Sequence, residues 1–421
     1  MTWDDDSEDS EDAYGLSADE IPNVGAVTDD TSVYRVGRLT QILRRRAAAI
    51  GAVILLCVVA IAVPVAVLVG KTGDEPASGE TSAPVSATGF SKPGKAGDSG
   101  RSGFAAQSWW ASLFSADPPV SQTDATTNAI LLGANELGQV PILMYHKIGN
   151  DVVPPARLRD DIARLKAAGF YPTTIRELAD GSMDIPAGKS PVVLTFDDSS
   201  PTHYKILPDG SIDPDCAVAI MREAAAAGDW APKASFFPLL YLDTSANILF
   251  GQPEYAQKKL QDLVSWGFEI GSHTVDHLNL ATSSPGHITE ELAESQARLE
   301  ELIGGGYQIY TLNPPYGEFP DDPSLLASGE SAGVSYQYKA CLRAAGGYGY
   351  SPFSTKFDPM DMPRVTAYPT STVPDLVWYF REYPGLRYVS DGNPQVVSAP
   401  ANVAEKLGNL RTGLNRQVVR Y

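Results

Sequence analysis

The stretch Pro191–Asp198, which reads Pro-Val-Val-Leu-Thr-Phe-Asp-Asp, joins an apolar run to two adjacent carboxylates. A run of this kind is typical of a buried strand. About 75 residues further along the chain, the largely apolar segment 268–271 is followed by His273 and His277. Two imidazoles and one carboxylate can hold a divalent metal, and the second carboxylate is then available beside it. The two segments therefore predict strands that deliver a centre for activating water.

Outward from these segments, short apolar runs alternate with amphipathic helical patterns. Such alternation predicts a parallel α/β sheet or barrel. Thr289 is the expected N-cap of the last of these helices, because acidic residues follow in its first turn. The predicted strands are 140–145, 191–196, 234–237, 268–271 and 307–312, and the predicted helices are 158–168, 216–226, 254–266 and 289–303.

The candidate residues share a position relative to the predicted strands. In parallel α/β barrels the chemistry lies at the C-terminal strand ends. Asp197, Asp198, His273 and the turn Pro314–Gly317 all follow predicted strands, which favours a single site. On one helical turn, His273 and His277 would face the same way and share a metal. The residues alone leave two alternatives open: an Asp-Asp pair that only caps a turn, and a histidine pair in an exposed polar loop.

These motifs give the chain a family resemblance. The sequence resembles the polysaccharide deacetylases, carbohydrate esterase family 4, over roughly residues 138–370. Leu194–Asp198 is similar to the family's first motif, and Ser272–His277 to its second. The resemblance implies a distorted (β/α) barrel. Two weaker matches are Pro314–Gly317, which resembles the end of the family's third motif, and Ser235–Phe237, which resembles its Thr-Phe-Phe strand. A third is Pro141–His146, which resembles the opening strand of the branch that acts on poly-N-acetylglucosamine and cell-wall polymers.

The resemblance also implies a role for each residue of the site. Asp198, His273 and His277 are the expected ligands of a divalent metal, with Zn²⁺ as the expected ion. Asp197 is the expected general base. The backbone N–H of Tyr316 is expected to help hold the tetrahedral oxyanion. The residues expected to line the substrate site are His146, Pro315 and Asn313.

Two departures from the family's pattern concern the surroundings of Asp197. Asn313 stands where the family usually has an arginine that holds the base. No histidine follows His287, although the family often has a late histidine as general acid. The segment Asp358–Met362 partly resembles the family's Asp-x-x-Asp-Trp motif, and Arg364 follows closely. We hypothesise that Arg364 reaches the base from a neighbouring strand and replaces the missing arginine.

The remaining histidines supply candidates for the missing proton donor. His146 follows a predicted strand and is the first candidate for a residue lining the site, with solvent or a carboxylic acid as other possible donors. A buried structural histidine is the alternative interpretation of His146. His203 and His287 are expected on the surface.

The N-terminal third has a different character from the predicted barrel. Residues 1–46 are predicted to form a disordered acidic cytoplasmic tail, and residues 47–70 an apolar transmembrane helix. Arginines gather before the apolar segment, so the positive-inside rule places the rest of the chain outside the cell. A cleaved signal peptide is the competing interpretation. Residues 71–137 are predicted to be a Gly/Ser/Pro-rich extracellular linker, and residues 138–421 the catalytic domain.

Charge and cysteine content limit the possible partners. The formal net charge of −19 makes nucleic acid an unsuitable partner, because phosphate binding requires a concentrated basic surface. Outside the apolar segment, the only cysteines are Cys216 and Cys341. They could form one disulfide in an extracellular domain or remain free buried thiols.

The sequence thus predicts a membrane-anchored, outward-facing, metal-dependent hydrolase. Its expected substrate is an N-acetylated cell-surface polysaccharide such as peptidoglycan or poly-N-acetylglucosamine. Two alternatives stay open at this point. One is an O-acetyl esterase that uses the same metal and base. The other is a catalytically degenerate glycan-binding module, which Asn313 and the absent late histidine would favour.

Overall fold

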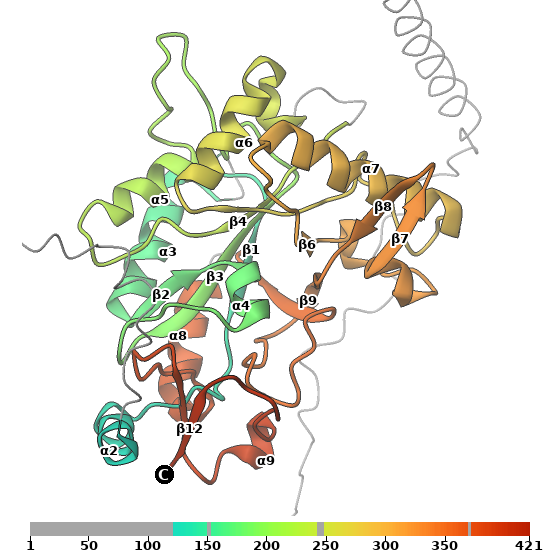
Figure 1. Ribbon diagram of the computed structural model, residues 1–421. Helices are drawn as coiled ribbons and strands as arrows, with labels where there is room; N and C mark the ends of the chain where they lie inside the picture. The colour runs from blue at the N-terminus through green and yellow to red at the C-terminus, as the bar shows by residue number, and fades with distance from the viewer. Residues whose placement is uncertain (1–120, 150–152, 242–247, 369–371) are drawn as a thin grey trace, which may run out of the picture. The chain divides into compact units, whose positions relative to one another are not determined.

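The computed structural model describes residues 121–149, 153–241, 248–368 and 372–421 (Figure 1). The predicted acidic tail 1–46, the predicted span 47–70 and residues 71–120 of the predicted linker lie outside these residues. Among the helices of the described ranges, none is long and apolar enough to cross a bilayer.

Eight parallel strands form the central sheet, in the order β5-β4-β3-β1-β10-β9-β6, with β2 paired to the first half of β3. The backbone N–H of Ser272 donates to the carbonyl of Thr311, and the N–H of Asn313 donates to the carbonyl of Ser272, both at 2.9 Å. These bonds join the chain after β5 to β6, so the sheet nearly closes into a barrel. The strands are β1 (Ile142–Tyr145), β2 (Phe170–Thr173), β3 (Ser190–Asp197), β4 (Ser235–Phe237), β5 (Glu269–Ile270), β6 (Thr311–Leu312), β9 (Ala340–Gly346) and β10 (Met362–Thr366).

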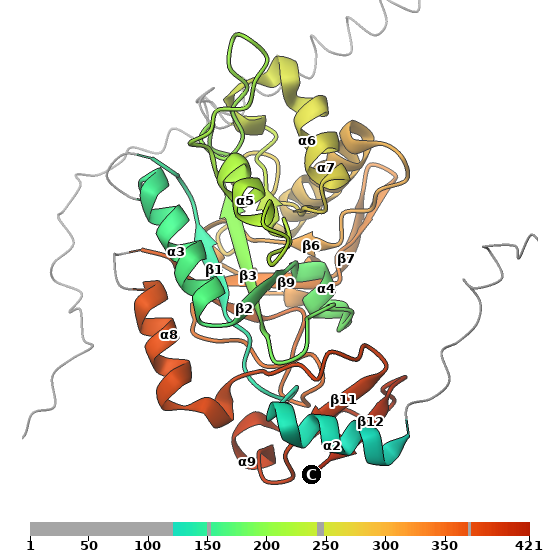
Figure 2. The same ribbon diagram turned by 90° about the vertical axis from the view of Figure 1, so that its left-hand side faces the viewer.

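The predicted parallel α/β architecture is confirmed. All eight residues of β3 are buried, as expected for a strand of a parallel sheet that is covered on both faces. Helices cover the outside of the sheet, and α3 packs against both α5 and α8 (Figure 2). The helices are α3 (Pro155–Ala167), α4 (Ile175–Asp180), α5 (Ala217–Ala225), α6 (Ala256–Ser265), α7 (Pro285–Ile303) and α8 (Thr372–Glu382).

The two largest differences from the predicted boundaries concern α7 and β6. Helix α7 begins at Pro285 and not at Thr289, because Ser284 is the N-cap and its Oγ accepts a hydrogen bond from the N–H of His287. Proline suits the first helical position, where its missing N–H would have no intrahelical partner. The strand predicted at 307–312 contracts to β6, because only Thr311 and Leu312 pair with β9.

Two small sheets flank the barrel. The antiparallel strands β7 (Ser328–Ser331) and β8 (Val334–Gln337) lie against α7 (Figure 1). The parallel strands β11 (Val396–Ala399) and β12 (Gln417–Arg420) pack against α2 (Gln122–Leu132) (Figure 2). The remaining short elements are α9 (Ala404–Leu407) and the 3-10 turns η2 (Leu249–Gly251), η3 (Pro253–Tyr255), η4 (Pro315–Gly317), η5 (Pro323–Leu326) and η6 (Pro384–Leu386).

The folded domain begins before residue 138, the predicted boundary, because it includes helix α2. This helix lies within residues 71–137, which the sequence assigned to the linker. Ala125 and Ala129 of α2 are buried in a cluster with Val396 and Val419 of the C-terminal strands. The folded domain therefore includes residues before 138. The short alanine-rich face of this helix is easily mistaken for linker composition.

Glu136 connects this C-terminal layer to the barrel. Its carboxyl accepts hydrogen bonds from the N–H of Ser398 at 2.8 Å and from the hydroxyl of Tyr388 at 3.2 Å. Its backbone carbonyl accepts from Oγ of Ser351 at 2.5 Å. Burial and the nearby charge of Asp391 raise the pKa of Glu136 to about 8.

This raised pKa predicts a specific pH dependence of stability. The folded protein keeps the proton on Glu136 up to about pH 8, whereas the unfolded chain releases it near its ordinary value of 4.5. Since the folded state binds more protons in this window, the free energy of unfolding falls as pH rises, by up to about 1.4 kcal/mol per pH unit from this group. Glu136→Gln stays neutral and is expected to remove this contribution. Urea denaturation between about pH 5 and about pH 8 measures it. An unchanged slope in the variant would contradict the assignment.

Cys216 and Cys341 are free thiols, and both are buried. Burial raises the pKa of each thiol. Of the two possibilities left open by the sequence, the structure therefore has the free buried thiols.

Candidate metal centre and active site

The two adjacent aspartates have different surroundings because the chain changes direction where β3 ends. Asp197 is the last residue of β3, and only 2% of its side chain is exposed. Asp198 has a φ of 66°, in the left-handed region, and 26% of its side chain is exposed. Consecutive positions thus supply one buried and one partly exposed carboxylate.

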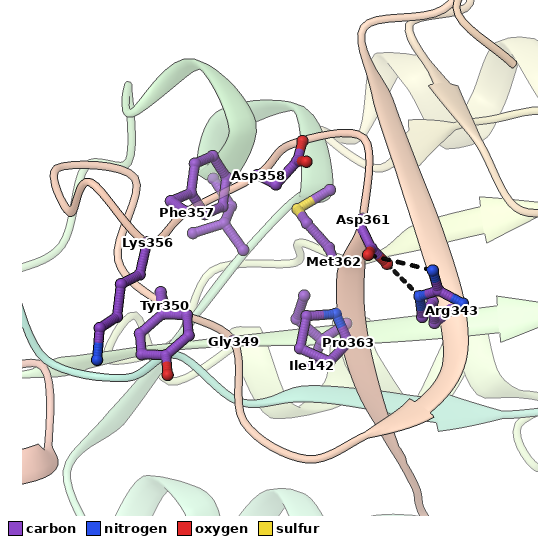
Figure 3. A pocket seen from close by; sticks show the side chains of 11 residues that line it. Ile142, Arg343, Gly349, Tyr350, Lys356, Phe357, Asp358, Asp361, Met362 and Pro363 are labelled. Atoms are coloured by element: carbon purple, nitrogen blue, oxygen red, sulfur yellow. Dashed lines mark hydrogen bonds and ion pairs between the residues drawn. The ribbon is translucent and has the colours of Figure 1, made fainter. Parts of the chain in front are cut away.

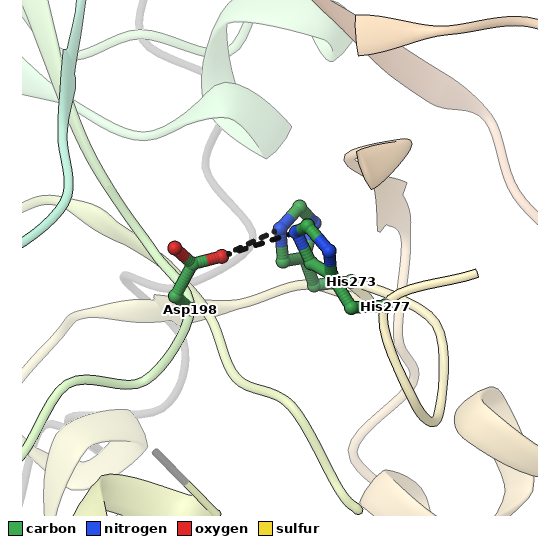
Figure 4. Close-up of side chains that lie close together, drawn as sticks. All are labelled: Asp198, His273 and His277. Carbon is green, nitrogen blue, oxygen red and sulfur yellow. Dashed lines mark hydrogen bonds and ion pairs between the residues drawn. The ribbon is translucent and has the colours of Figure 1, made fainter. Parts of the chain in front are cut away.

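Asp198, His273 and His277 lie together with their polar atoms facing one another (Figure 4). Oδ1 of Asp198 is 3.1 Å from Nε2 of His273 and 3.4 Å from Nε2 of His277. Bonds of about 2.0–2.2 Å at tetrahedral angles place neighbouring zinc ligands roughly 3.3–3.6 Å apart. The two distances from Asp198 are close to this spacing and all three donor atoms lie within 4.8 Å of one another, so these residues can hold a divalent metal.

The loop that carries the two histidines is not the helical turn that we expected. Thr274 and His277 have φ values of 64° and 65°, so the backbone reverses within the loop. Nδ1 of His273 donates to the carbonyl of Asn313 at 2.5 Å. A hydrogen bond of this kind fixes the tautomer and leaves Nε2 available as a metal ligand. The histidines converge because of a strained turn.

The charges of the three residues are coupled. Burial raises the pKa of Asp198, but hydrogen bonds with His273 and His277 outweigh it and hold that pKa far below its ordinary value. Burial lowers the pKa of His273, yet its hydrogen bond to Asp198 and the charges of both aspartates raise this pKa above its ordinary value. These pKa shifts keep Asp198 ionised and make His273 hold its proton more strongly than a free imidazole does.

Arg364 of β10 contacts the carboxylate of Asp197, as we hypothesised. Its Nη1 donates to Oδ1 and Oδ2 of Asp197 at 3.0 and 2.9 Å. Nη1 also lies 3.0 Å from Oγ1 of Thr195, and Nη2 donates to Oδ1 of Asn313 at 2.8 Å. The Nε–H donates to the carbonyl of Arg343 at 2.7 Å. Asn313 thus binds the guanidinium of Arg364, which contacts Asp197 from β10.

The guanidinium determines the protonation of Asp197. Burial raises the pKa of Asp197, but the charge of Arg364, with smaller effects of His273 and His146, lowers it below its ordinary value overall. Asp197 is therefore an anion at neutral pH, although it is buried.

His146 lies on the other side of Asp197. Its Nε2 is 3.9 Å from Oδ2 of Asp197, and its Nδ1 is 3.4 Å from the hydroxyl of Tyr368. About a third of its side chain is exposed, so it lines the accessible part of the site.

His203, which we expected on the surface, is fully buried, and its Nε2 donates to the carbonyl of His146. Burial lowers the pKa of His203 to about 3, so this imidazole is neutral.

The turn Pro314–Gly317 forms another wall of the site. Tyr316 has a φ of 64° and is 62% exposed, and its ring lies 4.6 Å from the ring of His277 between centroids. Pro315 and Asn313, which were expected to line the substrate site, are both buried. Gly317 is required by close packing, since a Cβ there would lie 2.5 Å from Cβ of Ala344 in β9.

Sequence reasoning missed three residues that support the site. Thr195 contacts Arg364, and the two-residue period of a strand could have placed it on the face of Asp197. Tyr368 approaches His146, and Glu291 of α7 binds the histidine loop. No local pattern marks either of these two, because both contacts depend on how distant elements pack.

The segment Asp358–Met362 lies away from the metal ligands. Asp358, Asp361 and Met362 line a cavity of about 270 Å³ together with Ile142, the first residue of β1 (Figure 3). The cavity is thus at the N-terminal end of β1 and β10. Asp361 forms an ion pair with Arg343, with Nη2 and Oδ2 3.2 Å apart.

Comparison with known proteins bears on the same residues. Residues 227–336 match the family described as polysaccharide deacetylase. This part of the chain is thus similar to the polysaccharide deacetylases. The matched range includes the His273–His277 loop and the turn Pro314–Gly317, and it begins after Asp197 and Asp198.

Similar proteins carry related names. The chain is 24% identical over 219 residues to YxkH of Bacillus subtilis (strain 168), whose name gives polysaccharide deacetylase as its candidate activity. The alignment covers 50% of this chain and 69% of YxkH. A Streptococcus pyogenes deacetylase, PplD, in complex with acetate is 21% identical, with a TM-score of 0.42 over 57% of this chain and 97% of PplD. IcaB from Ammonifex degensii is 16% identical, with the same TM-score and coverage.

Proposed function

We propose that this protein is a metal-dependent hydrolase that removes N-acetyl groups from a cell-surface polysaccharide of the peptidoglycan or poly-N-acetylglucosamine type. One observation carries the proposal. Asp198, His273 and His277 bring three possible metal-ligating atoms within 4.8 Å of one another, and a second carboxylate, Asp197, is held separately beside them. The polysaccharide deacetylase match supports this class of substrate.

The residues divide the work of amide hydrolysis. A Zn²⁺ ion held by Asp198, His273 and His277 would polarise the acetyl carbonyl and lower the pKa of the attacking water. Asp197 accepts the proton of that water, and Arg364 keeps this carboxylate oriented and ionised. The developing oxyanion is stabilised further by the backbone N–H of Tyr316.

The leaving amine needs a proton, and we propose His146 as the donor. It is the partly exposed imidazole beside Asp197, with its Nε2 3.9 Å from Oδ2. Asp197 can pass the proton that it has accepted to His146, which then protonates the amine. Tyr368 and the backbone contact from His203 fix the position of this imidazole.

The N-terminal segment completes the proposal. We infer that residues 47–70 anchor the protein in the cell membrane, with the N-terminus in the cytoplasm and the catalytic domain outside. Residues 71–120 would then let the domain reach a polymer beyond the membrane.

Acetate release from N-acetylglucosamine oligomers tests the function. We expect one free amine for each acetate released, loss of activity after removal of metal with a chelator, and recovery when Zn²⁺ is added. Parallel assays with O-acetylated glycans separate the esterase alternative, because that reaction frees no amine. Glycan binding without acetate release by the zinc-loaded protein would contradict the proposal and favour a binding module.

A further inference from the structure

The loop between the two histidine ligands is strained. Thr274 and His277 both carry a Cβ and both have φ values above 60°. Residues in this region cost of order 1–3 kcal/mol each and persist only when their surroundings hold them. The loop therefore needs partners outside its own sequence.

Glu291 of α7 is such a partner. Its side chain is 1% exposed, and its Oε2 accepts hydrogen bonds from the N–H of Val275 at 2.9 Å and of Asp276 at 3.2 Å. Both N–H groups belong to the residues between His273 and His277. A single buried oxygen thus fixes the middle of the loop.

Ser295 extends the same contact one helical turn further along α7. Its Oγ donates to the carbonyl of Thr274 at 3.2 Å and lies 2.8 Å from Oγ of Ser272. Residues four apart on a helix face the same way, so Glu291 and Ser295 hold the loop from one side. From the other side, the N–H groups of Leu240 and Tyr241 donate to the carbonyl of Val275.

We propose that Glu291 is a positioning residue for the metal centre: its two hydrogen bonds hold the histidine loop in the geometry that binds the metal. The inference rests on the metal site of the proposed function. Without these bonds the loop can relax from its strained turn, and His277 then leaves the position 3.4 Å from Asp198. Groups one layer behind metal ligands typically change metal affinity about 10–100-fold when they are replaced.

The test is the Zn²⁺ dissociation constant of the full chain, measured by competition with a chromophoric chelator. Glu291→Leu, which removes the acceptor of both hydrogen bonds, is expected to weaken Zn²⁺ binding at least about tenfold. Glu291→Gln keeps an oxygen acceptor of nearly the same reach and is expected to bind within a few-fold of wild type. Glu294→Gln is the matched control, because Glu294 is an exposed carboxyl on the same helix.

Wild-type affinity in Glu291→Leu would overturn the inference. An equal loss in Glu291→Leu, Glu291→Gln and Glu294→Gln would also overturn it, because that pattern reports general destabilisation. If Glu291→Leu does not fold, Glu291→Asp withdraws the carboxyl from the loop by one methylene and should show the tenfold loss. Failure of the wild type to bind Zn²⁺ is a distinct result, because it rejects the proposed metal site itself.

Discussion

Asp197→Asn is expected to lower the rate of acetate release by about 10²–10⁴-fold, the usual contribution of a well-placed general base. The asparagine keeps the shape of the side chain but cannot accept the proton of the attacking water. Zn²⁺ binding should persist, because the three expected ligands are Asp198, His273 and His277. The measurement is kcat together with the zinc content of the purified protein.

Asp198→Asn and His273→Ala are the matched controls for this experiment. Both remove an expected ligand, so activity and bound metal should be lost together. Full turnover by Asp197→Asn at unchanged zinc content would show that another group is the base.

Arg364→Met is expected to lower the free energy of unfolding by about 3–5 kcal/mol at neutral pH. The methionine fills a similar volume but leaves the carboxylate of Asp197 buried without its cation. Three other groups also lose a partner, namely Thr195, Asn313 and the carbonyl of Arg343. Urea denaturation of the metal-free protein measures the effect without a contribution from bound metal.

The sign of the pH dependence follows from the lowered pKa of Asp197. The folded protein binds this proton more weakly than the unfolded chain, so the ion pair contributes its full stability above the unfolded pKa. That contribution is lost as pH falls through the folded pKa. The difference in free energy of unfolding between wild type and Arg364→Met should therefore shrink in acid.

Asp197→Asn combined with Arg364→Met should recover part of the lost stability, because no charge is then buried alone. A constant difference at all pH values would contradict the ion-pair explanation.

The parallel barrel could be predicted from local patterns. The unbroken apolar run of β3 identifies a strand covered on both faces, and the alternation with helices identifies parallel connections. The ends of these strands also gave the positions of Asp198 and His273, because side chains at C-terminal strand ends converge in this architecture.

Other features depend on strand order, which a single sequence does not reveal. Arg364 contacts Asp197, 167 positions earlier in the chain, because β3 and β10 pair with the two edges of β1. This contact was hypothesised from the missing arginine at Asn313, and the sequence offered no geometric reason for it. The burial of His203 and the packing of α2 on the C-terminal strands are equally non-local. The strained loop of His273 and His277 escaped prediction because nothing in its residues demands positive φ values.

The division of labour between the two adjacent aspartates is the central claim, and anomalous diffraction at the zinc edge tests it most directly. In crystals of the zinc-loaded protein we expect one anomalous peak about 2.0–2.2 Å from a carboxylate oxygen of Asp198 and from Nε2 of both His273 and His277. Asp197 should remain bound to Arg364 and should not be a ligand. A peak coordinated by Asp197, or no peak at these three residues, would contradict the claim.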